Sequence, residues 1–187
     1  SGAQGTAIAS ALASLGAEVV FVTGPSDVAP PSGVEVVAVQ SAAEMLQAVR
    51  NALPVDAGVF AAAVADWRVK RESNSKIKKQ DGKLPILEFA ENPDILADVS
   101  QMKKDRPGLV VGFAAETDDV IANATAKRKR KGCDWIVAND VSPETGIMGG
   151  TENAVHLITD QGVEDWPRMG KGEVARQLAE RIAAALG

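Results

Sequence analysis

An acidic residue at the end of an apolar run, followed ten residues later by a cluster of lysines, is the arrangement in this chain best suited to chemistry. The run covers residues 59–65 and leads to Asp66, while Lys76, Lys78 and Lys79 lie in a polar stretch without periodicity. Lysine binds phosphate as a point charge, and a carboxylate can bind a sugar hydroxyl, a base edge or a metal ion. The pattern predicts a polyphosphate site, with Asp66 ending a buried strand and the lysines on a mobile flap over residues 67–85.

Two further groups of residues suit an anionic ligand. The turn over residues 1–5, Ser-Gly-Ala-Gln-Gly, leads into an alanine-rich stretch, and its N–H groups either cradle an anion or close a tight turn. Lys127 and Lys131 are i,i+4 neighbours on one helical face, where they either point at a triphosphate or complement the helix dipole. Both interpretations stay open for each group.

Apolar runs alternate with helical patterns along the chain, as in an α/β fold. Strands are expected over residues 17–22, 34–39, 57–65, 86–89, 109–116 and 135–138, with a hairpin over 154–159 and 163–166. Helices are expected over 5–15, 41–52, 117–131 and 173–186, with a further helix that has Asn92 as its N-cap and Pro93 first. Ser41 and Glu44 form a capping box, and Gly16 and Gly132 stop helices. Because the strands are continuous apolar runs, we predict a mostly parallel sheet with helices on both faces and a terminal β-hairpin.

Ligands of such sheets bind beyond the carboxyl ends of the strands. The residues at those ends are Gly24, Asp66, Glu116, Asn139 and Asp140, although the last two fit a simple turn equally well. A glycine-bracketed turn like that of residues 1–5 normally follows the first strand of a nucleotide-binding α/β unit. No such strand precedes it in this sequence, and we expect the first strand to be missing from this chain.

The composition fits a single compact domain that spans all 187 residues, 45% of which are hydrophobic. The net charge of −5 argues against a general nucleic-acid or membrane-surface binder. A single cysteine, Cys133, cannot form an internal disulfide, so the cytoplasm is the expected compartment. No apolar run approaches the roughly 20 residues of a membrane span.

The sequence lacks two common catalytic arrangements. It has no G-x-x-x-x-G-K-[ST] phosphate loop and no serine–histidine–acid set. The only histidine, His156, is expected to be structural or exposed, and Cys133 has no nearby base to activate it. The residues therefore predict a nucleoside-triphosphate site without a P-loop and without a protein nucleophile.

Five short motifs then occur in one order: AAVADWR at 62–68, KIKK at 76–79, NPDI at 92–95, GFAAET at 112–117 and ANDV at 138–141. Together they resemble bacterial phosphopantothenate–cysteine ligase over essentially the whole chain. This enzyme is usually the C-terminal half of a bifunctional coenzyme A biosynthesis protein, whose other half is a flavin-dependent decarboxylase.

The resemblance implies a Rossmann-like homodimer that uses CTP and Mg²⁺. The carboxylate of 4′-phosphopantothenate attacks the α-phosphate of CTP, which gives an acyl-cytidylate and pyrophosphate. The amine of L-cysteine then displaces CMP and forms the amide. FMN would belong to the separate decarboxylase domain, and neither nucleic acid nor membrane is an expected partner.

The resemblance also implies roles for individual residues. Lys76 is the catalytic flap lysine, which binds the triphosphate and the leaving pyrophosphate. The expected nucleotide-binding set is Gly24, Phe60, Ala61, Ala62, Asp66, Lys76, Pro93, Asp94, Ile95, Leu96, Phe113, Lys127 and Lys131. The expected substrate-binding set is Ser1, Gly2, Asn139 and Asp140, while the metal ligands are not identified. The family usually has lysine at the position of Ala3, and an arginine and an asparagine upstream of the turn.

Three other functions stay open. The glycine-rich turn and the parallel sheet also fit an NAD(P)-binding oxidoreductase, although G-x-G-x-x-G is missing. A non-catalytic nucleotide-binding or oligomerisation module is the second. Nucleic-acid binding through residues 127–131 is the third, and the acidic chain argues against it.

Overall fold

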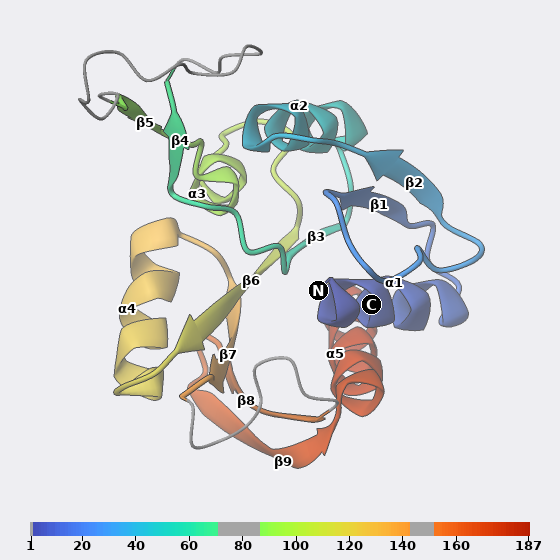
Figure 1. The fold of residues 1–187 in the computed structure, drawn as a ribbon. Coiled ribbons are helices and arrows are strands. Elements are labelled where there is room, and N and C mark those ends of the chain that lie inside the picture. Colours follow the sequence, from blue (N-terminus) through green and yellow to red (C-terminus); the bar gives the residue numbers. More distant parts are fainter. Residues whose placement is uncertain (1, 71–86, 143–151) are drawn as a thin grey trace.

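The computed structural model describes residues 2–70, 87–142 and 152–187 and has the predicted alternation of strands and helices (Figure 1). In chain order the elements are α1 (Ala3–Ser14), β1 (Val20–Thr23), β2 (Glu35–Ala38), α2 (Ala42–Ala52), β3 (Ala57–Phe60), β4 (Trp67–Val69), β5 (Phe89–Glu91), α3 (Ile95–Ser100), β6 (Leu109–Glu116), α4 (Val120–Lys131), β7 (Trp135–Asp140), β8 (Glu152–Ile158), β9 (Val163–Gly170) and α5 (Lys171–Leu186).

The main sheet has the strand order β3-β6-β7-β8-β9. Strands β3, β6 and β7 are parallel, and β8 and β9 form an antiparallel hairpin beside β7. The predicted sheet and terminal hairpin are thereby confirmed. Along β6, residues 109–112 are all buried, as expected for a strand that is covered on both faces.

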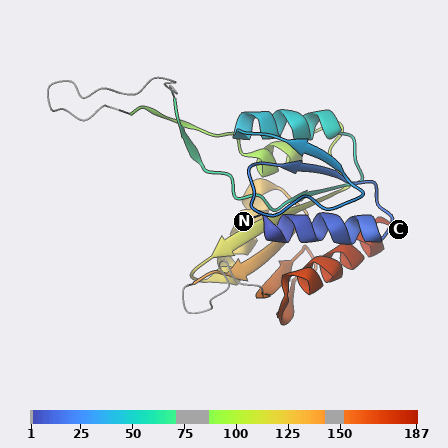
Figure 2. The same cartoon turned by 45° about the vertical axis from the view of Figure 1, so that its right-hand side comes forward.

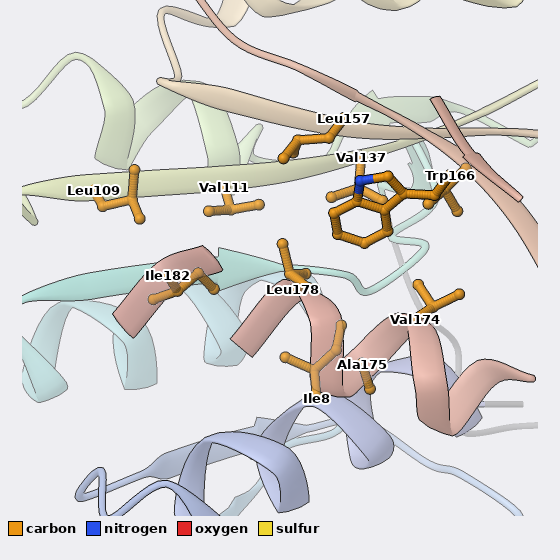
Figure 3. Close-up of a cluster of buried hydrophobic side chains, with 11 residues drawn as sticks. Ile8, Leu109, Val111, Val137, Leu157, Trp166, Val174, Ala175, Leu178 and Ile182 are labelled. Carbon is orange, nitrogen blue, oxygen red and sulfur yellow. The ribbon is translucent and has the colours of Figure 1, made fainter. Parts of the chain in front are cut away.

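Helices cover the two faces of this sheet (Figure 2). On one face α1 and α5 pack together, and Ile8, Leu178 and Ile182 meet Val111 and Val137 of the sheet (Figure 3). On the other face lie α3 and α4, where Leu96 and Ala124 pack near Val110 and Ile136. Figure 3 shows side chains of α1, α5 and the strands of the sheet in one cluster, and this packing fixes the α1/α5 layer against the sheet.

Strands β1 and β2 form a separate parallel pair. The strand predicted over residues 17–22 corresponds to β1, which is shorter. None of the residues of β1 is buried, so the prediction of a buried strand is wrong. Helix α1 nevertheless connects the two sheets. A Cβ added to Gly5 would lie 3.9 Å from Ala61 Cβ, after β3, and 4.0 Å from Phe21 Cε2 on β1.

The strand predicted over 57–65 is wrong in its second half. β3 ends at Phe60, and the alanine-rich residues that follow leave the sheet. The chain then enters a two-stranded antiparallel ribbon, β4–β5, that projects from the rest of the fold (Figures 1 and 2). The predicted flap over 67–85 thus begins with strand β4, while its residues 71–85 lie outside the described residues.

Helix starts were predicted with mixed success. Ser41 is confirmed as the N-cap of α2, because the Glu44 N–H donates to Ser41 Oγ at 3.2 Å, while the second arm of the predicted capping box is shifted by one residue, with Gln40 N–H donating to Glu44 Oε2 at 2.9 Å. The start of α3 at Asn92 is wrong, since Asp94 is the N-cap and accepts from Ala97 N–H at 3.1 Å. Gly132 ends α4 in the left-handed region, φ 78°, as predicted.

Candidate functional site

The carboxyl edge of the parallel strands is uneven. Phe60, the last residue of β3, pairs with Gly112, whereas β6 and β7 continue together to the pair Glu116 and Asp140. The last residues of β6, from Phe113 to Glu116, therefore have no strand partner among the described residues on the side of β3. The described candidate residues lie in two main groups, one on each face of the sheet.

The first group lies on the face covered by α3 and α4. Lys131, the last residue of α4, donates a hydrogen bond to and forms an ion pair with Asp94, the N-cap of α3. Partial burial acts to raise the pKa of Asp94. The hydrogen bonds from Lys131 and Ala97 and the charges of Lys131 and Arg130 outweigh it, so the pKa stays below its usual value.

Leu96 and Lys127 belong to the same face. Leu96 packs directly over Gly112, where an added Cβ would lie only 2.6 Å from Leu96 Cδ2. Ile95 is 6% exposed and therefore contributes to packing rather than to an open surface. Lys127 lies one helical turn before Lys131 and is half-buried. This face thus brings a lysine pair next to the N-terminus of a short helix.

Asp66 is tied to this face by the backbone. Asn92 N–H donates to Asp66 O at 2.8 Å, and Asn92 Nδ2 donates to Ala65 O at 2.8 Å. The expectation that Asp66 ends a buried strand is wrong, because it is exposed and lies just before β4. Asn92 therefore acts as a clamp between two candidate segments, in place of the helix cap that the sequence predicted.

The second group lies on the face covered by α1 and α5. Phe113 packs against the cluster of that face, and the alternation along β7 puts Asn139 on the same side as Val137. Gly2 has φ 69°, and an added Cβ would lie 2.5 Å from Ser26 Oγ, so only glycine fits this turn. The structure does not bring Phe113 together with the lysine pair, since the sheet lies between them.

Asp140 faces the α4 side. Hydrogen bonds from Ser142, first from its backbone N–H at 2.8 Å, lower the pKa of Asp140, and the nearby His156 contributes in the same direction. His156 Nδ1 lies 2.6 Å from Asp165 Oδ1 on the neighbouring strand, so it has a structural partner. Burial raises the pKa of the Cys133 thiol, which disfavours a nucleophilic thiolate.

Gly24 lies apart from both groups. It follows β1 and lines a hollow of about 150 Å³ together with Val39, Ser41, Met45 and Val64. Thr23 Oγ1 donates to its carbonyl at 3.0 Å. Phe60, Ala61 and Ala62 lie at the end of β3, and Ala62 is exposed.

Ser1, Lys76, Lys78 and Lys79 lie outside the described residues. Within the described ranges, no group of three or more histidine, cysteine, aspartate or glutamate side chains is arranged to hold a metal ion. Mg²⁺ is commonly bound by one or two carboxylates together with substrate phosphates. The exposed Asp66 carboxylate fits that kind of shared site, whereas an all-protein cage does not fit the described residues. Nor does any described helix combine the length and apolar character needed to cross a bilayer.

Sequence reasoning missed two polar residues of the α1/α5 face. Gln4 Nε2 donates to Lys171 O at 3.2 Å, and Asn153 lies on β8 with 5% of its surface exposed. The available signal was that Asn153 is in phase with the apolar residues Val155 and Leu157 along strand β8.

A mostly parallel α/β sheet with candidate ligand residues on both faces of its carboxyl edge defines a Rossmann-like domain. The chain belongs to the DNA/pantothenate metabolism flavoprotein C-terminal domain family, whose profile matches residues 1–186. This confirms the family expected from the five motifs.

Individual relatives agree with this assignment. The chain is 40% identical over 185 residues to the coenzyme A biosynthesis bifunctional protein CoaBC of Vibrio parahaemolyticus, covering 98% of this chain and 44% of that protein. It is 42% identical over 186 residues to CoaBC of Escherichia coli, covering 97% and 45%. A crystal structure of the C-terminal domain of a CoaBC protein matches with TM-score 0.80 and 37% identity, covering all of this chain and 83% of that one. The chain spans about half the length of the curated relatives it matches.

Proposed function

We propose that this domain is a ligase of coenzyme A biosynthesis that joins 4′-phosphopantothenate to L-cysteine with CTP. The observation that carries the proposal is the pair of residue groups on the two faces of one strand edge. A nucleotide on the α3/α4 face and an acyl substrate on the α1/α5 face would meet across that edge. Membership of a family whose relatives are named for coenzyme A biosynthesis supports it.

The proposed reaction has two steps. A carboxylate oxygen of 4′-phosphopantothenate attacks the α-phosphorus of CTP, pyrophosphate leaves, and an acyl-cytidylate forms. The cysteine amine then attacks the acyl carbon, CMP leaves, and the amine loses a proton as the amide forms. Orientation of the reactants and neutralisation of phosphate charge are the main requirements on the protein. Neither step requires a protein nucleophile, which agrees with the burial that raises the pKa of the Cys133 thiol.

The residue roles follow the two groups. Asp66, the segment from Pro93 to Leu96, and the lysines Lys127 and Lys131 would bind the nucleotide, and Lys76 would bind the triphosphate and pyrophosphate. Gly2 and Asn139 would bind the acyl substrate. Mg²⁺ would neutralise triphosphate charge when bound, with Asp66 as its candidate protein ligand. A homodimer in the cytoplasm, and a covalently linked FMN-containing decarboxylase domain, complete the proposal.

Calorimetry tests the nucleotide first. In the presence of Mg²⁺ we expect CTP to bind with micromolar affinity and ATP and NADPH to bind at least tenfold more weakly. Tight binding of NADPH that CTP does not displace would instead support the oxidoreductase. If none of the three binds to the full-length polypeptide, the proposed nucleotide site is wrong.

Lys76→Ala tests the catalytic assignment. We expect the folded variant to lose most acyl-cytidylate formation, because the charge that stabilises the leaving pyrophosphate is removed. The matched control is Lys129→Ala, which removes an exposed lysine of α4. Formation of acyl-cytidylate by Lys76→Ala at the parental rate would show that the assignment is wrong.

A further inference from the structure

Two buried amide oxygens on the α1/α5 face have no hydrogen-bond partner within the described part of the chain. They are Gln4 Oε1 at the start of α1 and Asn153 Oδ1 near the start of β8. Asn153 is 5% exposed, and only Ser100 is a comparably buried polar residue among those described. Most buried side-chain polar atoms in folded proteins are paired, so an unpaired one calls for a specific explanation.

The two amides lie at the same end of the sheet. Asn153 pairs across the hairpin with Met169, and α5 begins two residues later at Lys171, whose carbonyl accepts from Gln4 Nε2 at 3.2 Å. Asn153 shares its sheet face with Val155 and Leu157, which pack against α5. Its amide therefore points toward the layer formed by α1 and α5.

A residue of the proposed substrate group lies next to Asn153. Asn139 pairs with Val155, and Asn153 is two positions from Val155 along β8, so the two asparagines are diagonal neighbours on one face. The carboxyl edge of β7 and the glycine turn at the start of α1 thus flank the unpaired oxygens. An apolar side chain at position 153 would remove the cost of burying an unpaired amide, so the fold itself does not explain the asparagine.

We propose that Gln4 and Asn153 form a polar subsite that recognises the pantothenoyl part of 4′-phosphopantothenate, an inference that rests on the proposed function. Two amide oxygens accept hydrogen bonds from two neutral donors. Between its phosphate and its carboxylate, 4′-phosphopantothenate carries two such donors, a secondary hydroxyl and an amide N–H. The subsite determines specificity and takes no part in bond making.

Asn153→Leu provides the test, with 4′-phosphopantothenate and CTP titrated separately by calorimetry into the full-length polypeptide. We expect the dissociation constant for 4′-phosphopantothenate to rise at least tenfold, the constant for CTP to stay unchanged, and the melting temperature to stay equal or rise. The matched control is Ser100→Ala, which removes another buried unpaired polar group, on α3 at the opposite face of the sheet, and should change neither constant.

Each other outcome has a defined meaning. Unchanged 4′-phosphopantothenate binding in a folded Asn153→Leu variant overturns the subsite while leaving the ligase intact. A variant that loses CTP binding as well shows a structural role and also overturns it. If Asn153→Leu does not fold, Gln4→Met, on the half-buried face of α1, carries the same test. If the parent binds CTP but not 4′-phosphopantothenate, the proposed function fails and the subsite fails with it.

Discussion

At the scale of single residues, the Lys131–Asp94 pair shows how one side chain can serve both stability and ligand binding. Asp94 caps α3, and Lys131 holds it through an ion pair in which the lysine side chain is only 19% exposed. Both residues belong to the proposed nucleotide group. If Lys131 binds a triphosphate as proposed, the triphosphate would compete with Asp94 for the lysine.

Asp94→Asn isolates the charge of this pair, because asparagine is as good an N-cap as aspartate. We expect the variant to lower the free energy of unfolding at pH 7 by about 0.2–1 kcal/mol, the usual range for an exposed ion pair. The native pKa of Asp94 lies below the ordinary value of 3.8, so its contribution is complete above that value and is lost as the pH falls through the native pKa.

Urea unfolding of the parent and of Asp94→Asn between pH 7 and pH 2.5 measures the difference in their free energies of unfolding. The difference between the two proteins should shrink as the pH falls below the ordinary pKa of aspartate, because protonation of folded Asp94 removes the charge that Asp94→Asn also removes. The same comparison is then made in a Lys131→Met background. There, Asp94→Asn should cause a much smaller pH-dependent change in the free energy of unfolding. A difference that stays constant across the whole range would contradict the assigned pKa direction.

At the scale of elements, local sequence patterns predicted the buried strands and several helix ends. The buried runs of β6 and β7, the Ser41 N-cap of α2 and the glycine stop of α4 follow from local patterns, and each is confirmed. Local patterns failed where an apolar run leaves the sheet. Residues 61–65 have strand-like composition, but β3 pairs with β6 only as far as Phe60, and no partner continues beyond it.

The candidate site shows the same division. The sequence identified strand ends and lysines at helical spacing, because these depend on local order. It could not identify Asn153 or the Asn92 clamp, because both depend on contacts between segments far apart in the chain.

At the scale of the whole molecule, the β4–β5 ribbon projects from the rest of the described fold. A two-stranded ribbon alone is marginally stable in water. One face of this ribbon carries Trp67 and Phe89, which are 58% and 60% exposed, and the register puts them on the same side. Leu87, 49% exposed, continues that face. Exposed apolar patches of this kind mark interaction surfaces, and the proposed homodimer gives the ribbon a partner.

The double variant Trp67→Ser/Phe89→Ser tests this surface. If the ribbon faces meet in the dimer, sedimentation should show a dimeric parent and a monomeric variant at the same micromolar concentration, because removal of two large aromatic side chains eliminates most of the apolar contact. Leu186→Ser, which removes a leucine 46% exposed at the end of α5, should remain dimeric. A dimeric double variant would place the interface elsewhere, and a monomeric parent would refute the homodimer itself.

The ribbon leads directly from Asp66, so loss of the dimer should also weaken CTP binding if the interface orders that segment.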